Sequence, residues 1–165
     1  VEKVLWEGDQ IIHTGSIKGI SPSEGTVVDC SIDEDKRILN TKLHSAGHLI
    51  DMCLRNMKTE FRPQKGYHYP DGPYVQYEGT VESNEFFREN LENEIQQLIN
   101  SDLKTQIIIR EGGSIGKVQR EISFGDYVIP CGGTHVSSLS ELKGLQIRKI
   151  KTKNGCTKIS YAIEV

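Results

Sequence analysis

Two histidines four residues apart, His44 and His48, are the first side chains in this sequence that could hold a metal ion. In a helix this spacing puts both imidazoles on one face, one turn apart, where they can bind a single cation. Metalloproteases have the same spacing with a glutamate directly after the first histidine, but Ser45 stands here, so the proteolytic base is absent. Alone, the pair is equally compatible with a polar helix face that only meets solvent.

A second group of ligand-type side chains is Cys131 and His135, which are separated by Gly132, Gly133 and Thr134. Glycines allow the backbone conformations that a tight loop needs, so both donors can point inward. A buried cysteine beside a loop histidine would produce the same pattern. In isolation this second pair therefore favours ordinary packing over metal binding.

Taken together, the two pairs supply three imidazoles and one thiolate, a normal tetrahedral ligand set for Zn²⁺. The sequence thus predicts one zinc ion held by His44, His48, Cys131 and His135. Four protein ligands leave two roles open. The site is either closed and structural, or the metal loses one ligand or merely orients the groups that do the chemistry.

Two helices are expected to position these groups. Apolar residues at helical spacing predict a helix over residues 41–57, capped by Asn40 or Thr41, and this helix carries the histidine pair. A second apolar stripe predicts a helix over residues 85–102, capped by Ser83 or Asn84. The charged residues 33–37 predict a solvated turn, and the Gly/Pro/Tyr-rich residues 66–74 predict a loop that ends regular structure.

Short apolar runs predict strands around these helices, and the clearest hairpin joins residues 145–151 to 158–165 through Asn154-Gly155, a dipeptide typical of type I′ turns. The remaining elements are an N-terminal hairpin over residues 4–12, strands at 26–30, 74–81, 105–110 and 127–129, and a short helix at 115–121. The predicted fold class is α+β, with helices packed on a mostly antiparallel sheet. We expect an N-terminal β segment over residues 1–34 and the main domain over residues 35–165.

The composition of this 165-residue chain limits the classes of protein. A hydrophobic fraction of 36% and a charged fraction of 26% are typical of a globular domain with its own core. A net charge of −3 argues against a general nucleic-acid coat, although a local basic patch remains compatible with it. No apolar run has membrane-spanning length, no signal peptide is visible, and the expected location is the cytoplasm. Because the chain opens with Val1 rather than Met, a preceding piece is also expected.

The two ligand motifs carry a family resemblance. Residues 44–48 (HSAGH) followed by residues 131–136 (CGGTHV) resemble the editing domain of alanyl-tRNA synthetases and the free-standing AlaX trans-editing proteins. Residues 64–67 (QKGY) resemble the short loop after the metal helix of this family, and residues 141–147 (ELKGLQI) resemble its strand entry after the zinc motif. The resemblance covers about residues 35–165, and residues 1–30 resemble the end of the family's small N-terminal barrel.

This resemblance implies an aminoacyl-tRNA deacylase that contains zinc and clears tRNA(Ala) charged with serine or glycine. It also implies a role in protein biosynthesis, with nucleotide and ATP binding as properties of the synthetases. By matching position, the catalytic candidates are Gln64, Cys131 and Thr134. The substrate-binding candidates are Gly66, Tyr67, Gly132 and Gly133. The backbone N–H groups of the two glycines could stabilise an oxyanion. Tyr67 and Tyr74 could stack on the terminal adenine, although core or rim packing of their rings is the favoured interpretation.

Two departures from the family pattern are Gly47, where Thr often stands, and Lys158, where Arg is frequent. Basic residues gather near the C-terminal hairpin and form either a phosphate-contacting strip or a solvated face, namely Lys143, Arg148, Lys149, Lys151, Lys153 and Lys158. Two alternatives to the deacylase stay open. One is a non-catalytic zinc module that binds tRNA within a larger synthetase, and the other is threonyl-type editing of Ser-tRNA(Thr), although the CGGTH form favours the alanyl type.

Overall fold

The computed structural model describes the whole chain except residues 9, 83, 112–117 and 165. It divides into two compact units, Val1–Ile32 and Asp33–Val165. The first unit holds one antiparallel hairpin of β1 (Lys3–Glu7) and β2 (Gln10–Thr14), with Leu5 opposite Ile12. This confirms the hairpin predicted over residues 4–12. The strand expected at residues 26–30 is wrong, because Val27 is 94% exposed and this segment pairs with no other described strand.

The second unit begins with α1 (Glu34–Asn56), which starts earlier than the sequence predicted. Its N-cap is Asp33, whose carboxylate accepts a hydrogen bond from the Lys36 N–H at 3.0 Å. Glu34 and Asp35 then lie in the first turn, where negative charge interacts favourably with the helix dipole. The solvated turn predicted at residues 33–37 is therefore wrong, as is the cap at Asn40 or Thr41, because charged residues that form a first helical turn are also solvated.

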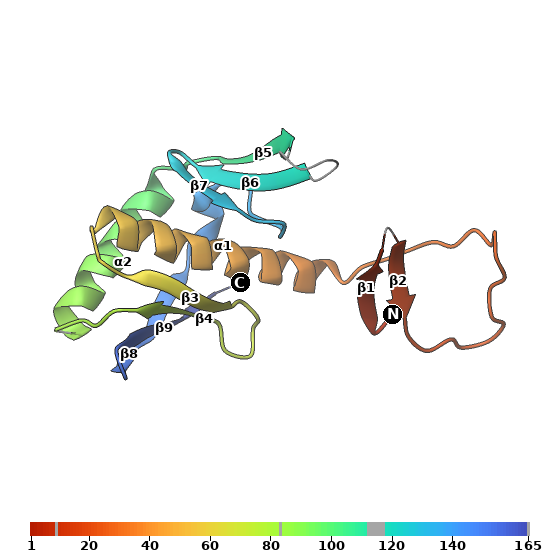
Figure 1. Ribbon diagram of the computed structural model, residues 1–165, viewed down its shortest axis with the longest axis horizontal. Helices are drawn as coiled ribbons and strands as arrows, with labels where there is room; N and C mark the ends of the chain where they lie inside the picture. Colours follow the sequence, from red (N-terminus) through yellow and green to blue (C-terminus); the bar gives the residue numbers. More distant parts are fainter. Residues whose placement is uncertain (9, 83, 112–117, 165) are drawn as a thin grey trace. The chain divides into compact units, whose positions relative to one another are not determined.

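Antiparallel sheets and a second helix complete this unit. The four-stranded sheet has the order β3-β4-β9-β8, and the three-stranded sheet has the order β5-β6-β7. The bounds are β3 (Arg62–Tyr67), β4 (Tyr74–Glu78), α2 (Asn84–Asn100), β5 (Thr105–Glu111), β6 (Val118–Phe124), β7 (Tyr127–Pro130), the 3₁₀ helix η1 (Leu139–Leu142), β8 (Leu145–Lys153) and β9 (Cys156–Ile163). The predicted α+β class with helices on antiparallel sheets is confirmed. Figure 1 shows α1 running between the two sheets of this unit.

Several local predictions can be compared with these bounds. The C-terminal hairpin is confirmed, since Asn154 and Gly155 both have positive φ angles of 52° and 74°, as a type I′ turn requires. The helix predicted at residues 115–121 is wrong where it can be compared, because residues 118–121 lie in β6, while residues 115–117 fall outside the described residues. Gln64 to Tyr67 belong to β3 rather than to a loop. The alternative cap Ser83 also lies outside the described residues.

The core of the second unit forms where the helices meet the sheets. Side chains from α1, α2, β4, β6, η1, β8 and β9 contribute, among them the fully buried Leu49, Ile50, Leu91, Ile95 and Ile159. Removing this apolar surface from water holds α1 in place along its length. Because His44 and His48 share that helix, the core also sets their position. In the described part of the chain, no helix is both long enough and apolar enough to cross a membrane.

Candidate metal centre

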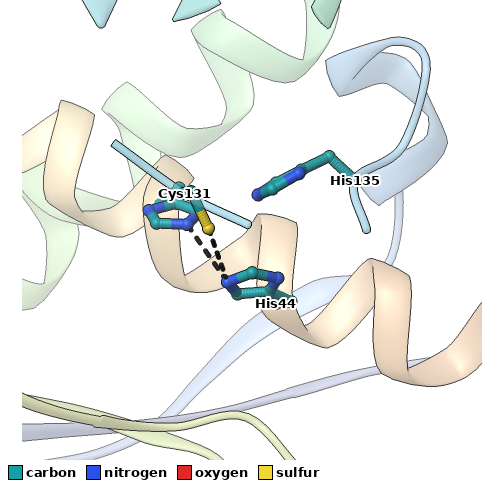
Figure 2. A group of neighbouring side chains, drawn as sticks. His44, Cys131 and His135 are labelled. Carbon is teal, nitrogen blue, oxygen red and sulfur yellow. Dashed lines mark hydrogen bonds between the residues drawn. The ribbon is translucent and has the colours of Figure 1, made fainter. Parts of the chain in front are cut away.

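The four predicted zinc ligands come together although they lie far apart in the sequence. The donor atoms of His44, His48, Cys131 and His135 all lie within 4.8 Å of one another. The first two project from one face of α1, and the other two come from the segment that follows β7. Figure 2 shows the His44 ring close to the Cys131 sulfur, with the His135 ring directed at the same region.

The spacing of these donors suits a tetrahedral ion. Nε2 of His44 lies 3.2 Å from Nε2 of His48 and 3.5 Å from Sγ of Cys131. With zinc bonds of about 2.0–2.1 Å to nitrogen and about 2.3 Å to sulfur, tetrahedral neighbours lie roughly 3.4 Å (N···N) and roughly 3.6 Å (N···S) apart. Both ring nitrogens of His135 are buried without a hydrogen-bond partner in the described part of the chain. A bound cation would satisfy one of them, so the residues present fit a zinc ion.

The ligand rings are oriented by groups behind them. Nδ1 of His44 lies 3.2 Å from the carbonyl oxygen of Thr134, and Nδ1 of His48 lies 3.8 Å from Oδ2 of Asp51. The Tyr77 hydroxyl donates a hydrogen bond to the other carboxylate oxygen of Asp51. Such partners fix which ring nitrogen faces the metal. Here they leave Nε2 of both helix histidines for the ion.

Burial and charge set the protonation of the cluster. Burial, together with the neighbouring His44 and His48, lowers the pKa of His135 to about 3. Burial also acts to lower the pKa of His48, but the neighbouring Asp51 carboxylate and Cys131 thiol outweigh it and raise that pKa to about 9. For the Cys131 thiol, the hydrogen bond from His48 and the Gly133 N–H outweigh burial and lower the pKa. Zinc needs a thiolate and neutral imidazoles, so its binding would displace the proton that His48 holds.

The loop from Cys131 to His135 is fixed against α1. Arg120 on β6 donates hydrogen bonds to the carbonyl oxygens of Cys131 at 2.5 Å and Gly133 at 2.9 Å. The Ser45 hydroxyl, fully buried on α1, accepts a hydrogen bond from the Val136 N–H at 3.0 Å. A Cβ atom at Gly133 would collide with the His44 ring, whereas one at Gly132 would meet nothing within 4 Å. The close approach of loop to helix therefore requires glycine at position 133.

A cavity of about 540 Å³ opens beside the cluster, and the ligand His44 is part of its wall. Five of the predicted site residues line it, namely Gly66, Tyr67, Gly132, Gly133 and Thr134. The cavity also has four residues that the motifs did not indicate, Arg37, Asn40, His68 and Tyr69. The structure thus brings together the loop after β7, the end of β3 and helix α1.

Gln64 lies elsewhere. Its side-chain oxygen accepts hydrogen bonds from the Gln76 amide at 3.3 Å and the Cys156 thiol at 3.5 Å. It lines a smaller cavity of about 200 Å³ together with Asp51 and His68. His68 and Gly66 line both cavities. Gln64 lines only the smaller cavity, and His44 lines only the larger one.

The two tyrosines expected to contact adenine lie together. The Tyr67 and Tyr74 rings are stacked with centroids 6.0 Å apart, and the Tyr67 hydroxyl donates to Asp71 at 2.9 Å. Nζ of Lys158 lies 3.5 Å from the centroid of the Tyr74 ring. Tyr74 is therefore engaged by this ammonium group and by Tyr67, while Tyr69 remains 55% exposed beside them.

Sequence reasoning missed several residues of the site. Arg37 was assigned to a turn and Asn40 to a cap, whereas the longer helix places both beside the cavity. His68 has no neighbouring ligand-type residue in the sequence that would single it out. Asp51 gave one usable signal, since it follows His48 by three residues and so lies on the same face of α1. Arg120 gave none, because its role depends on the pairing of β6 with β7.

Comparisons with known proteins agree with the motifs. Residues 120–156 match the family described as "Threonyl and Alanyl tRNA synthetase second additional domain". The chain is 28% identical to alanyl-tRNA editing protein AlaX-L of Pyrococcus horikoshii over 93% of its own length and 41% of that protein. It is 30% identical to the alanine–tRNA ligase of Streptococcus agalactiae over 85% of its own length and 18% of the ligase. The ligase of Mycoplasma mycoides is 28% identical over 87% of the chain.

These matches confirm the resemblance on which the site residues rest. The chain is similar to an AlaX-type editing protein and to alanine–tRNA ligases, and its residues 120–156 are similar to the additional domain that the matched family model describes. It spans less than half the length of these curated relatives, with 41% of AlaX-L and 18% of the ligases covered.

Proposed function

We propose that this chain is an editing module that hydrolyses mischarged aminoacyl-tRNA, with Ser-tRNA(Ala) and Gly-tRNA(Ala) as its substrates. One observation carries the proposal: His44 belongs both to the four-donor cluster and to the wall of the 540 Å³ cavity. The same cavity is lined by the loop residues Gly132 to Thr134. A metal cluster that only stabilised the fold would have no need of a polar cavity at one of its ligands.

The reaction is ester hydrolysis. The water oxygen bonds to the carbonyl carbon, and the bond between that carbon and the ribose oxygen breaks. The amino acid leaves with a free carboxylate, one proton of the water passes to the ribose oxygen, and the other is released to solvent. Nothing in this reaction consumes ATP, so ATP binding stays a prediction for a longer protein that resembles the synthetases.

Negative charge develops on the carbonyl oxygen during the attack, and donors on the cavity wall can stabilise it. The Gly132 N–H is the backbone donor that we assign, since the Gly133 backbone contributes instead to the lowered pKa of the Cys131 thiol. The Thr134 hydroxyl lies 2.8 Å from that of Thr41 and adds a second polar group on this wall. We therefore assign oxyanion stabilisation to Gly132 and Thr134, and Cys131 to the metal.

We assign zinc as the cofactor because three imidazoles and a thiolate form a borderline-soft donor set. When bound, the ion would supply positive charge next to the cavity that His44 lines. The chain's own residues hold the ligands, with Thr134 behind His44 and Asp51 behind His48. They also place the loop donors at the edge of the cluster.

An editing site that is separate from the synthetic site of a synthetase explains how serine is removed. A synthetic site shaped for alanine rejects an added hydroxyl only weakly, whereas a polar site can accept it through hydrogen bonds. Oδ1 of Asn40 is buried beside the cavity with no partner among the described residues. It is our candidate to receive that hydroxyl. Arg37 at the same wall is a candidate for a phosphate of the acceptor end.

The proposed partner is tRNA(Ala), and the proposed place of action is the cytoplasm, where charged tRNA is used. The four exposed basic residues of β8, Arg148, Lys149, Lys151 and Lys153, are candidates to contact its phosphates. Residues 1–34 and 35–165 remain proposed as a partial barrel and an editing domain. Gln64, Gly66 and Tyr67 remain proposed as substrate contacts at the end of β3.

A deacylation assay tests the function. Metal-loaded protein is mixed with Ser-tRNA(Ala), Gly-tRNA(Ala), Ala-tRNA(Ala) and Ser-tRNA(Thr), and release of the amino acid is followed. We expect cleavage of the first two and little cleavage of the third. Turnover of Ser-tRNA(Thr) instead would indicate threonyl-type editing. Absence of turnover with every substrate, while the protein still binds tRNA, would favour the non-catalytic module.

Elemental analysis tests the cofactor separately. The purified chain is expected to contain about one zinc ion, and Cys131→Ala is expected to lose it because a three-ligand site binds much more weakly. The matched control is Cys30→Ala, since Cys30 is an exposed free cysteine in the first unit. Full zinc content in Cys131→Ala would refute the ligand set.

A further inference from the structure

His68 is outside the candidate ligand set, yet it lines both cavities next to the cluster. It follows β3 directly, its side chain is partly buried, and its ring centroid lies 5.3 Å from that of His44. Among the described residues, the two cavities share only His68 and Gly66, and a glycine has no side chain. The His68 ring is therefore the side chain that can separate one cavity from the other.

On α1, the ring lies at the point where one cavity ends and the other begins. His44 lines only the larger cavity of about 540 Å³, whereas Asp51, about two turns further along, lines only the smaller one of about 200 Å³. Gly47 lies between them, and a Cβ atom there would lie 2.7 Å from Nδ1 of His68. The ring thus packs on the helix backbone between the two cavities.

The residues of β3 follow the same order. Gln64 lines only the smaller cavity, Tyr67 lines only the larger one, and Gly66 between them lines both. A Cβ atom at Gly66 would lie 2.9 Å from Cε1 of His68 and closer still to its Nε2, which real Cβ contacts do not allow. His68 is therefore a partition that extends from α1 to β3, and glycines at both contact points make room for it.

A hydrogen bond holds the partition in place. The Tyr161 hydroxyl lies 2.6 Å from Nδ1 of His68, and it donates to the carbonyl oxygen of Leu43 at 3.0 Å. Tyr161 lies on β9 and is 2% exposed. Moving the imidazole ring aside would break its bond to this buried hydroxyl, which costs free energy. The partition is thus a fixed wall rather than a side chain that turns freely.

The smaller cavity behind the partition is polar. The amides of Gln64 and Gln76 and the carboxylate of Asp51 line it together with Lys65. The two charged side chains have opposite signs, so the cavity favours neither a cation nor an anion by charge alone. Amides donate and accept hydrogen bonds, and carboxylates accept them. An uncharged polar side chain would therefore be held better in this space than an apolar one of the same length.

We propose that His68 is a specificity-determining residue that closes the substrate cavity against amino acids with side chains longer than that of serine. The proposal rests on the ester hydrolysis proposed above. Along α1, Asn40 lies on one side of His44, and the His68 ring lies on the other, over Gly47. Glycine and serine need no space beyond the ring, whereas a longer side chain has to enter the volume that the ring occupies.

Removal of the partition tests this role. Wild type and His68→Ala are assayed with tRNA(Ala) charged with serine, glutamine or methionine, since the last two side chains are similar in length and differ in polarity. We expect wild type to cleave the serine ester and to spare the other two. In His68→Ala, kcat/KM for the glutamine ester relative to the serine ester should rise about tenfold or more, because one methylene group in a closed pocket changes discrimination roughly 10- to 200-fold. The methionine ester should gain less.

Two further variants keep the test decisive. His68→Asn retains a group that can bind the Tyr161 hydroxyl but lacks the far part of the ring, so its gain for glutamine should be smaller than that of His68→Ala. It replaces His68→Ala if circular dichroism shows that the alanine variant is unfolded. The control is His13→Ala, which changes an exposed histidine of the first unit and should keep the wild-type preference. Zinc content shows whether each variant retains the cluster.

Binding is measured separately from hydrolysis. The probes are adenosine analogues that carry serine or glutamine through an amide in place of the ribose ester, and calorimetry with the full chain reports their affinities. We expect wild type to bind the serine analogue and to reject the glutamine analogue. His68→Ala should bind both.

Each outcome separates the role of His68 from the hydrolysis. Equal cleavage of serine and glutamine esters by wild type, or no gain for glutamine in a folded His68 variant, would overturn the partition and leave the hydrolysis standing. Equal gains for glutamine and methionine would indicate a loosened site and would also overturn it. If wild type cleaves no ester but the analogues bind as expected, the hydrolysis is refuted and the partition stands. If wild type binds neither analogue, both proposals are refuted.

Discussion

At the scale of single residues, the site depends on side chains behind the ligands as much as on the ligands. Asp51 is such a residue, because its carboxylate faces Nδ1 of His48 and is itself bound by the Tyr77 hydroxyl. His48 can donate only one ring hydrogen when it ligates a cation, and the Asp51 carboxylate, 3.8 Å from Nδ1, favours this hydrogen on Nδ1. The ligand motif alone contains no information about how strongly Asp51 interacts with His48.

Asp51→Asn is expected to weaken metal binding about 10- to 100-fold, the usual effect of losing a partner behind a ligand histidine. Asparagine keeps an acceptor for Tyr77, so the fold should be retained. Metal affinity is measured by competition with a coloured chelator. The matched control is Asp126→Asn, because the Asp126 side chain is 86% exposed. Equal affinities in wild type and Asp51→Asn would contradict the role of Asp51.

Gly133→Ala and Gly132→Ala test the packing of the loop on α1. The added Cβ at position 133 would meet the His44 ring, and displacing a packed group in this way costs about 1–3 kcal/mol. At position 132 the space is open. We expect Gly133→Ala to lose most of its zinc in elemental analysis and Gly132→Ala to retain it. The same zinc content in both variants would show that the loop can move away from His44.

At the scale of elements, α1 and its N-terminus are central, because the extra turns at the start of this helix bring Arg37 and Asn40 to the cavity. The helix starts at Asp33, which caps the N–H of Lys36. Apolar periodicity is a weak guide to such ends, since the first turns of a helix need no apolar residue when they extend beyond the core. The structure therefore corrects the predicted start of this element and, with it, the content of the site.

Asp33→Ala is expected to lower the free energy of unfolding of the second unit by about 1 kcal/mol, the usual contribution of an aspartate N-cap. Chemical denaturation followed by circular dichroism measures this change. Asp29→Ala, in the irregular part of the first unit, is the control and should leave stability unchanged. Equal unfolding curves for both variants would place the true start of α1 further along the chain.

At the scale of the whole molecule, the second unit contains the core and every candidate site residue. All buried apolar side chains that form the core lie between Leu43 and Ile163, and the four candidate ligands lie in the same range. The first unit consists of one hairpin and an irregular segment with exposed apolar residues such as Val27 and Ile20. Folding and metal binding should therefore be properties of the second unit.

A chain consisting of residues 33–165 is expected to fold, to bind about one metal ion, and to melt within a few degrees of the full chain. Calorimetry and elemental analysis measure these properties side by side. Chelation of the metal should lower the melting temperature of both chains by the same amount, since a ligand that binds only the folded state stabilises it. A truncated chain that is unfolded or binds no metal would show that the second unit depends on residues 1–32.

The sequence by itself determined the features that depend on near neighbours. The spacing of His44 and His48 places them on one helix face whatever surrounds the helix, and Asn154-Gly155 adopts positive φ angles without help from the rest of the chain. The identities of Cys131 and His135 likewise determined which metal the site could suit. These predictions rested on local geometry and donor chemistry; the structure agrees with the helix face and the turn, and the identity of the metal stays a prediction.

The tertiary structure alone decided which distant groups share the site. His68 reaches His44 only because Gly47 and Gly66 leave room for its ring and Tyr161 binds it, and these contacts join α1, β3 and β9. Gln64, a site candidate by its position in a motif, lies on a strand with a bulge, and its side-chain oxygen accepts hydrogen bonds from Gln76 and Cys156. Such contacts depend on the packing of elements far apart in the chain, which residue types and spacing do not encode.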